Sequence, residues 1–329
     1  MINPQPLFTI ATITYNSGLW VKQAIESVLA SGYEDFEYLI SDDHSTDDTW
    51  EQIQIYNDTR IRAWRNEKNI GEYPNRNKIL NEAKGRYILY IDGDDLLYKS
   101  TLRNIAEYIE AFPEAGMIWG VSTSANLYEV LPFLFEPAIT LKLLYSNLYH
   151  LSVIGFAETV FSVDALKRIN NGFPEDYHLG DSFIRKKIAL TEKVLFIPLG
   201  LSFWRSSQNQ ASARLGIGLK GMTEGYEIDL RILNDSSYPL GAEERYKVLK
   251  NLKTSLIKRL VFQTIFRFRF YLFYKIFQRL KLSVNDLFLV FRKIDNEYLP
   301  VKDISSPLMN DYNFIRKGEQ MSSETTHNF

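Results

Sequence analysis

The stretch Tyr87-Ile88-Leu89-Tyr90-Ile91-Asp92-Gly93-Asp94-Asp95 decides the fold of this chain. Its first five residues form an apolar run that predicts a buried strand, and three carboxylates follow where that strand ends. Crowded like charges cost free energy unless a cation or hydrogen bonds compensate them, and hard oxygen ligands of this kind suit Mg2+ or Mn2+. The stretch therefore predicts a functional site with a divalent metal at the end of a core strand.

Strands and helices alternate on both sides of this stretch. The runs with strand character are residues 7–14, 36–40, 61–64 and 193–197, and the runs with helical spacing are residues 19–31, 49–56, 77–83, 101–110 and 181–190. Such alternation predicts an α/β fold with a mostly parallel sheet flanked by helices, which binds ligands outside the carboxyl ends of its strands. A second acidic loop, residues 41–48, also follows a strand, so we expect both acidic loops at one edge of the sheet.

Composition limits the classes of protein that this chain can form. The 329 residues, 45% of them hydrophobic, are enough for one large domain or a domain with an appendage. With no cysteine and four histidines, the sequence excludes disulfides and thiolate sites and argues against zinc. It also lacks a phosphate-binding loop and a dinucleotide fingerprint at a strand-to-helix turn. Because Met1–Pro6 shows no basic segment leading into an apolar one, we expect no secretory signal and a cytoplasmic protein.

Charge is distributed unevenly along the chain. The net charge is −2, yet residues 245–285 contain eleven Lys or Arg and no Asp or Glu. This asymmetry predicts an acidic catalytic body followed by a mainly helical, basic C-terminal region over residues 216–329.

Six short motifs, in order, resemble family 2 glycosyltransferases with a GT-A fold over roughly residues 7–212. The motifs are Tyr15-Asn16, Asp42-Asp43-His44-Ser45-Thr46-Asp47, Asn69-Ile70-Gly71, Arg76-Asn77, Ala83-Lys84-Gly85 and Asp92-Gly93-Asp94-Asp95. The resemblance implies a GT-A domain over residues 1–215, with a nucleotide-sugar-binding half (1–100) and an acceptor-side half (101–215). It also implies a metal-dependent, inverting transferase that moves a sugar from a nucleotide-sugar, usually UDP-linked, to a hydroxyl of a glycan or lipid-linked acceptor. Cell-surface polysaccharide or glycoconjugate synthesis is the implied setting.

The resemblance assigns the donor site residue by residue. Tyr15, Asp42 and Asp43 correspond to residues that hold the base and ribose, and Arg76 to one that orients the nucleotide. An aromatic face stacks on a base, and carboxylates accept from a base N–H or a ribose hydroxyl. The alternatives are that Ser45 and Asp47, with Asp42, cap the next helix and that Arg76 is a surface residue.

Asp94 and Asp92 correspond to the metal-binding carboxylates of the family. The resemblance makes Asp94 the direct ligand of Mn2+ or Mg2+, and Asp92 a contact of the ribose or of the metal. For Asp95 the alternative is that it caps the helix after Leu97.

The acceptor side rests on Asp181, which takes the position of the family's catalytic base. It belongs to a motif that includes Asn171 and in relatives usually ends in Glu-Asp, whereas this chain has Gly180 before the aspartate. An N-cap role for Asp181 is the alternative. Downstream, Arg205 is a candidate phosphate contact, but Ser207 replaces a histidine that many relatives carry.

Between Leu256 and Leu282, aromatic residues alternate with Lys and Arg, and no apolar run approaches the ~20 residues of a membrane span. This pattern favours a peripheral segment on an anionic membrane surface, at the inner face, over a helix packed on the catalytic body or in an oligomer. A nucleic-acid surface is the least favoured interpretation. No motif specifies an oligomeric state.

Two other functions are compatible with the fold. One is a non-catalytic protein that binds a sugar-nucleotide or a glycan, which the departures at Gly180 and Ser207 favour. The other is a nucleotidyltransferase, which would release pyrophosphate from a nucleoside triphosphate.

Overall fold

The computed structural model describes residues 5–121, 132–145, 155–169, 172–205, 219–265 and 267–292. An eight-stranded sheet with the order β3-β2-β1-β4-β8-β6-β9-β7 lies at its centre. The strands are β1 (Phe8–Thr14), β2 (Phe36–Asp42), β3 (Ile61–Arg65), β4 (Tyr87–Tyr90), β6 (Ala115–Gly120), β7 (Phe133–Phe135), β8 (Thr159–Ser162) and β9 (Lys193–Ile197). A small antiparallel pair, β5 (Leu96–Leu97) with β10 (Ser202–Phe203), lies beside it.

The predicted α/β fold with a mostly parallel sheet is confirmed. Strands β3, β2, β1 and β4 run parallel to one another, and so do β6 and β9. Strand β8 is antiparallel to both β4 and β6, and β7 is antiparallel to β9. Both antiparallel strands, β7 and β8, come from residues 133–162, a stretch for which the sequence predicted no strand. The division of the chain into domains stays a prediction.

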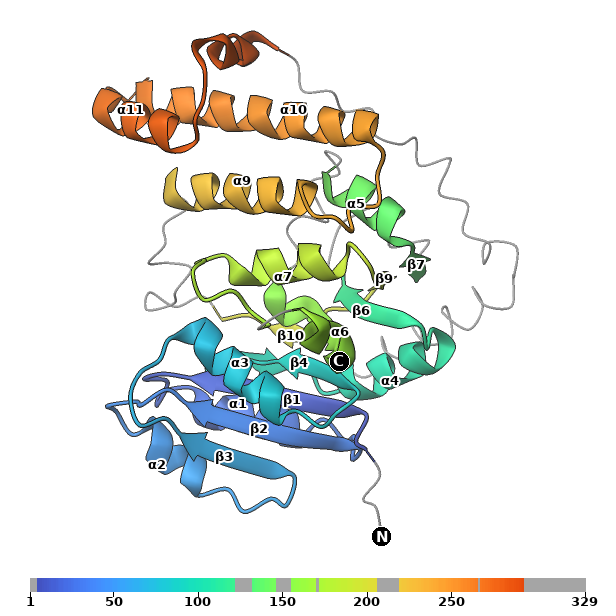
Figure 1. Ribbon diagram of the computed structural model, residues 1–329. Helices are drawn as coiled ribbons and strands as arrows, with labels where there is room; N and C mark the ends of the chain where they lie inside the picture. The colour runs from blue at the N-terminus through green and yellow to red at the C-terminus, as the bar shows by residue number, and fades with distance from the viewer. Residues whose placement is uncertain are drawn as a thin grey trace.

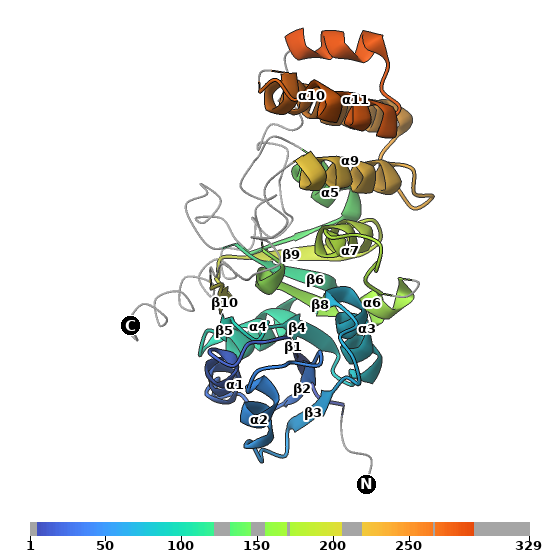
Figure 2. The ribbon, with the colours of Figure 1, turned by 90° about the vertical axis from the view of Figure 1, so that its left-hand side faces the viewer.

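Helices cover both faces of the sheet because the apolar side chains of the strands alternate (Figure 2). Helices α1 (Val21–Leu29), α2 (Thr49–Gln54) and α4 (Thr101–Ala111) pack on the face that carries Phe8 and Ile10. Helices α3 (Glu72–Glu82), α6 (Val163–Arg168) and α7 (Gly180–Ile188) pack on the face that carries Ala11 and Ile13. Helix α5 (Pro137–Tyr145) and the short η1 (Phe156–Glu158) join this second layer.

Helix α3 begins five residues earlier than predicted. We expected a helix over residues 77–83, but it starts at Glu72. The error came from Pro74, because proline interrupts a helix interior but is tolerated in the first turn, where its missing N–H has no intrahelical partner. The early start brings two side chains, Glu72 and Tyr73, into the site described below.

Four helical segments lie beyond the sheet at one end of the molecule (Figure 1). They are α9 (Leu219–Leu233), α10 (Ala242–Leu260) with its π-helical extension η2 (Val261–Ile265), α11 (Phe270–Arg279) and η3 (Val284–Phe291). Ile228 and Ile232 of α9 share the core of the α7 face, whereas Leu256, Ile257 and Ile276 form a separate cluster farther out. Among the described residues, no helix is both long and apolar enough to cross a membrane.

Candidate active site

The two acidic loops flank the end of β1, as predicted. Asp42 pairs with Thr14 in the parallel register, and the Asp43 N–H donates to the Thr14 carbonyl at 2.8 Å. On the other side of β1, the Gly93 N–H donates to the Ile13 carbonyl at 3.1 Å. Backbone hydrogen bonds from β1 therefore fix both loops at the carboxyl edge of the sheet.

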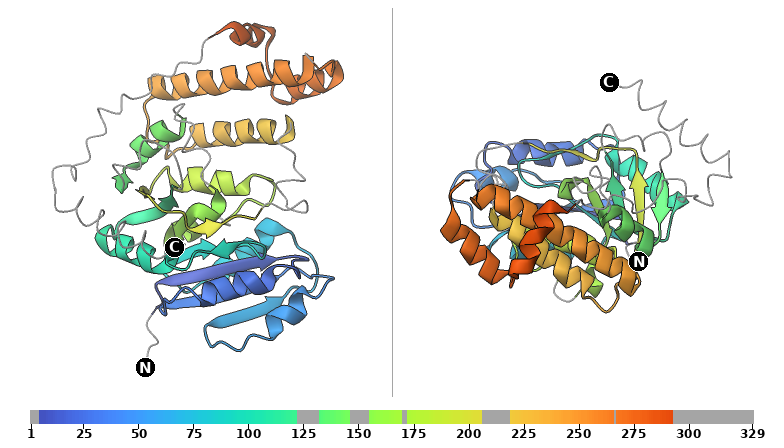
Figure 3. Two further views of the ribbon diagram at one scale, coloured as in Figure 1. Left: turned by 180° about the vertical axis from the view of Figure 1, so that it is seen from behind. Right: turned by 90° about the horizontal axis from the view of Figure 1, so that it is seen from above.

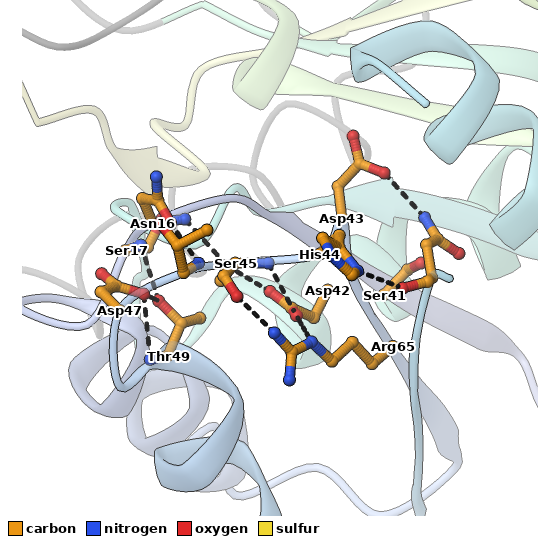
Figure 4. A network of polar contacts seen from close by, with 12 residues as sticks. Asn16, Ser17, Ser41, Asp42, Asp43, His44, Ser45, Asp47, Thr49 and Arg65 are labelled. Atoms are coloured by element: carbon orange, nitrogen blue, oxygen red, sulfur yellow. Dashed lines mark hydrogen bonds and ion pairs between the residues drawn. The ribbon is translucent and has the colours of Figure 1, made fainter. Parts of the chain in front are cut away.

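Asp42 is fully buried and anchors its own loop (Figure 4). Its carboxylate accepts from the Ser45 N–H at 3.1 Å and from the Ser45 hydroxyl, and it forms a 3.3 Å ion pair with Arg65 Nε. Burial raises the pKa of Asp42, while the hydrogen bonds from Ser45 and the charge of Arg65 lower it. The capping alternative is wrong for Ser45, whose hydroxyl is directed to Asp42 and accepts from the Asn16 N–H at 2.9 Å.

Asp43 anchors the next loop along the edge. Its carboxylate accepts from Asn66 Nδ2 at 2.9 Å, from the Ile70 N–H at 2.9 Å and from the Gly71 N–H at 2.8 Å. Gly71 has φ = +94°, which favours glycine, and it directly precedes α3. Asp43 therefore positions the start of α3 relative to β2.

Tyr15 projects from the turn after β1 and is 45% exposed. The following residue, Asn16, has φ = +52°, and its side-chain oxygen accepts from the Thr46 N–H at 2.8 Å. Asp47 accepts from the Gly18 N–H at 3.0 Å and from the Thr49 N–H at 3.1 Å, so capping is part of its role. These bonds join the turn to the Asp42 loop. They leave the Tyr15 ring partly exposed at the carboxyl edge of the sheet.

Arg76 is a buried residue of the site, so the surface alternative is wrong. It is 2% exposed, and its guanidinium lies 4.5 Å from the Phe156 ring centre and 5.2 Å from that of Tyr90. Nη2 contacts Glu72 at 3.0 Å and Asp92 at 2.9 Å. Burial opposes the charge, but the two carboxylates outweigh it and raise the pKa of Arg76.

Asp92 uses only one of its oxygens within the protein. Oδ2 accepts from Arg76, whereas Oδ1 is buried and has no hydrogen-bond partner. The nearby Thr14 hydroxyl is also buried without a partner, and a Cβ at Gly93 would lie 2.6 Å from it. An unpaired buried carboxylate oxygen is costly, so this position is suited to a ligand that supplies the missing contact.

Asp95 is not the cap of the next helix. It is 2% exposed, and its Oδ1 accepts from the Arg205 N–H at 2.9 Å. Burial and the charges of Asp92 and Asp94 raise the pKa of Asp95 to about 7, against the hydrogen bond from Arg205. The crowding of three carboxylates therefore already favours an additional cation or proton.

Arg205 contacts the backbone of the acidic loop that contains Asp92, Asp94 and Asp95. Its Nε donates to the Asp94 carbonyl at 2.9 Å, Nη2 donates to Gln23 at 2.9 Å, and its Cζ lies 4.0 Å from the Trp20 ring centre. These contacts give it a positioning role. Ser207 and Asn171, which we singled out in the sequence, lie outside the described residues.

Asp181 lies in the first turn of α7, one position after the first helical residue. Leu179 occupies the N-cap position, so the N-cap alternative for Asp181 is wrong. The Asp181 carboxylate is 28% exposed and 3.7 Å from Arg185 Nη2, and its N–H donates to the Tyr73 hydroxyl at 3.4 Å.

Glu72 is electrostatically coupled to Asp92, a candidate metal ligand, and to Asp181, the candidate base. Burial raises the pKa of Glu72 against the opposing charge of Arg76, and the charges of Asp92 and Asp181 raise it further. The early start of α3 therefore brings the metal-binding candidate and the base candidate into one electrostatic cluster. We missed Glu72 and Tyr73 in the sequence, although the i, i+4 pair of Glu72 with Arg76 was a signal for them.

The ring of Tyr73 explains why glycine precedes Asp181. A Cβ at Gly180 would lie 2.9 Å from Tyr73 Cζ and 3.0 Å from each Cε. The ring is held in place because its hydroxyl donates to the His178 carbonyl at 2.9 Å, and Tyr73 is 7% exposed. Tyr73 thus takes the space that a side chain at position 180 would need.

We expect Gly180→Ala to lower the free energy of unfolding by about 1–3 kcal/mol through overpacking. In a Tyr73→Ala background the same change should be neutral or stabilising, because alanine is the better helix former. Urea denaturation of the four proteins in this double-mutant cycle measures the coupling. Equal effects of Gly180→Ala in both backgrounds would contradict the steric explanation.

The carboxylates fit a Mg2+ or Mn2+ ion held partly by a substrate. Within the described residues no group of three or more His, Cys, Asp or Glu side chains could enclose a metal. Mg2+, however, commonly binds through one or two carboxylates together with substrate phosphates and waters. The unpaired Asp92 Oδ1 and the neighbouring Asp94 match that mode.

The sequence of this chain is similar to those of known glycosyltransferases. Residues 9–168 match the model described as Glycosyl transferase family 2. TuaG of Bacillus subtilis, whose name describes a glycosyltransferase of teichuronic acid biosynthesis, is 36% identical over 33% of this chain and 44% of its own length. The Escherichia coli UDP-Glc:alpha-D-GlcNAc-diphosphoundecaprenol beta-1,3-glucosyltransferase WfaP is 36% identical over 32% of this chain and 41% of its own length. The matches therefore span less than half the length of these two relatives.

Two solved structures share the fold. Residues 1–349 of S. aureus TarS in complex with UDP-GlcNAc have a TM-score of 0.60 and 17% identity, covering 86% of this chain and 78% of that one. The Pyrobaculum calidifontis mannosyltransferase PcManGT in complex with GDP-Man and Mn2+ has a TM-score of 0.58 and 18% identity, covering 77% of this chain and 70% of that one. At these identities the likeness shows the fold alone, and the predicted GT-A architecture is confirmed.

Proposed function

Because residues 9–168 make this chain a member of glycosyl transferase family 2, we propose that it is a metal-dependent, inverting glycosyltransferase of cell-surface polysaccharide synthesis. The observation that carries the proposal is the shared cluster of Asp92, Arg76, Glu72 and Asp181. It contains a carboxylate oxygen without a partner on the donor side and a partly exposed carboxylate on the acceptor side. Sugar transfer requires such a pair of positions, one for the leaving diphosphate and one for the attacking hydroxyl.

The proposed donor is a UDP-sugar held along the carboxyl edge of the sheet. The exposed ring of Tyr15 is free to stack on the uracil. Asp43 accepts three contacts within the protein, whereas a carboxylate offers about four lone-pair sites, so it retains capacity for a base N–H or a ribose hydroxyl. Asp42, which is fully buried, would contribute by holding the loop that carries Asp43. The UDP-GlcNAc complex of TarS and the UDP-Glc named as donor of WfaP support this nucleotide.

A Mn2+ or Mg2+ ion bound by Asp94 and Asp92 would neutralise the diphosphate and the charge that develops on it as it leaves. Arg76 holds Asp92 in place from the buried side, and Arg205 fixes the Asp94 backbone. Contacts within the protein therefore hold both aspartates of the acidic loop in place.

Asp181 is the proposed general base. An acceptor hydroxyl oxygen attacks the anomeric carbon, its proton passes to the Asp181 carboxylate, and the bond from that carbon to the diphosphate oxygen breaks. Attack opposite the leaving group inverts the configuration, so an α-linked donor gives a β-linked product. A lipid-linked sugar is the proposed acceptor, because WfaP is named for transfer to a diphosphoundecaprenol-linked sugar.

The test is a screen of nucleotide-sugars for Mn2+-dependent hydrolysis and for thermal stabilisation of the protein. We expect a UDP-sugar to be hydrolysed slowly, and Asp94→Ala to lower the rate by about 100-fold or more. Asp164→Ala is the matched control, since Asp164 is an exposed aspartate in the first turn of α6. Stabilisation by a UDP-sugar without hydrolysis or transfer would favour a non-catalytic binding protein, and release of pyrophosphate from a nucleoside triphosphate would favour a nucleotidyltransferase.

A further inference from the structure

The turn from η2 into α11 and the outer face of α11 expose an unusual number of aromatic side chains. Phe268 is 83% exposed and Tyr271 71%, and Phe270 and Tyr274 are also more than half exposed. Tyr271, Tyr274 and Gln278 follow one another at helical spacing on the outer face, whereas Ile276, Phe273 and Phe277 pack on the cluster beneath. Helix α11 therefore has an apolar inner face that is packed against this cluster and a second, aromatic face that is exposed to solvent. We call the exposed residues of this turn and helix the aromatic face.

The same surface is cationic. Arg267, Arg269, Lys275 and Lys281 are exposed, and none of them forms an ion pair with an acidic side chain among the described residues. In the same region Arg279 is paired with Glu227 at 2.6 Å and Lys253 with Asp286 at 2.6 Å. Four cations without an acidic partner among the described residues therefore lie next to the aromatic face.

The backbone presents Phe268 to solvent at a cost. Phe268 has φ = +57°, a left-handed conformation that is rare for a bulky residue. It packs edge-on against Phe270, with ring centres 6.3 Å apart, and this neighbour is itself exposed. Backbone strain at a residue whose side chain gains little burial is a feature of functional positions.

We propose that the aromatic face docks on an anionic lipid bilayer, with Phe268, Phe270, Tyr271 and Tyr274 at the interface and the four cations against the headgroups. Exposed aromatic rings and basic side chains are the two components of interfacial membrane binding. A second copy of the chain fits less well, because a two-fold contact would place the same cationic surface against itself.

The placement of α11 suits a lipid-linked acceptor. Strand β1 runs from the N-terminus toward the left of Figure 1, and α11 lies above that carboxyl end; Figure 3 shows the same relation from behind. A membrane contact on α11 would therefore lie on the same side of the molecule as the carboxyl end of β1. The link to catalysis rests on the proposed function, whereas the docking surface itself does not.

Sedimentation of the full chain with vesicles tests the proposal in the absence of nucleotide-sugar. We expect binding to vesicles of phosphatidylcholine with phosphatidylglycerol, weaker binding in high salt and little binding to pure phosphatidylcholine. Arg267→Gln with Arg269→Gln should lower the partition coefficient by about 25-fold, at about fivefold per charge. Arg103→Gln on α4 is the control for an exposed arginine elsewhere, and should bind as the parent does.

Phe268→Asn separates docking from folding. Asparagine tolerates the left-handed backbone, so the variant should be as stable as the parent or slightly more so, yet bind anionic vesicles several-fold more weakly. Ile55→Ser, which removes a 67% exposed apolar side chain at the end of α2, should leave binding unchanged. Vesicle binding that is absent in the parent, or equal in parent and variants, would overturn the proposal. So would a concentration-dependent dimer that the variants abolish, because it would assign the surface to a second copy.

Failure of docking and failure of the proposed function are distinguishable. The docking variants should hydrolyse soluble UDP-sugar at the parental rate, because none of the substituted residues lies in the active site. Asp181→Asn should still bind vesicles. A protein that binds vesicles but never turns over a nucleotide-sugar would retain the docking surface and lose the proposed function.

Discussion

Asp181→Asn is expected to lower the rate of sugar transfer by about 10²–10⁴-fold while the protein stays folded. The amide has nearly the shape of the carboxylate but takes up no proton, so the acceptor hydroxyl loses its base. Asp181 lies in the first turn of α7, and the loss of its charge at a helix N-terminus should cost at most about 1 kcal/mol of stability. Single-turnover kinetics with saturating donor, together with thermal unfolding, measure the two effects separately.

The control for this variant is Asp164→Asn, which changes an exposed aspartate in the first turn of α6. It removes the same kind of helix-terminal charge outside the site and should leave transfer unchanged. In the Asp181 variant the donor should still bind with the parental affinity, because the defect lies in proton transfer. A near-parental transfer rate in Asp181→Asn would show that another group, or the acceptor itself, disposes of the proton.

The first strands of the chain could be predicted from sequence because their signals are local. The apolar run at 87–91 and the β-branched run at 7–14 appear as β4 and β1, within a residue at each end. The placement of both acidic loops at one edge followed from parallel topology alone, since parallel strands share the direction of their carboxyl ends.

Arg76 and Gly180 show where sequence analysis stops. The sequence near Arg76 does not show whether this arginine faces water or is buried. Its guanidinium is buried against Phe156, which is 80 positions away in sequence. Likewise, Gly180 departs from the family motif for a reason found 107 positions earlier, in the Tyr73 ring. The antiparallel strands β8 and β7 were missed for the same reason, because their neighbours in the sheet are chosen by tertiary packing.

Replacing Arg76 with methionine is expected to lower the free energy of unfolding by about 1–3 kcal/mol, because Glu72 and Asp92, whose side chains are 38% and 36% exposed, lose a shared charged hydrogen-bond donor and then repel each other. The variant keeps an unbranched apolar stem near Tyr90 and Phe156 but leaves Glu72 and Asp92 facing each other without the guanidinium between them. Transfer activity should fall as well, since Asp92 loses the contact that holds it. Chemical denaturation and donor-binding measurements check the two losses.

The design that isolates the charge effect adds Glu72→Gln to Arg76→Met. Removing one of the two carboxylates should recover part of the lost stability, whereas a purely steric role for Arg76 predicts a further loss. Arg103→Met, on the exposed face of α4, is the matched control and should change stability by no more than about 0.5 kcal/mol. Activity should not return in the double variant, because Asp92 still lacks its partner. If the double variant regained transfer, Arg76 would serve only to neutralise Glu72, and the placement of Asp92 would depend on the backbone of the acidic loop instead.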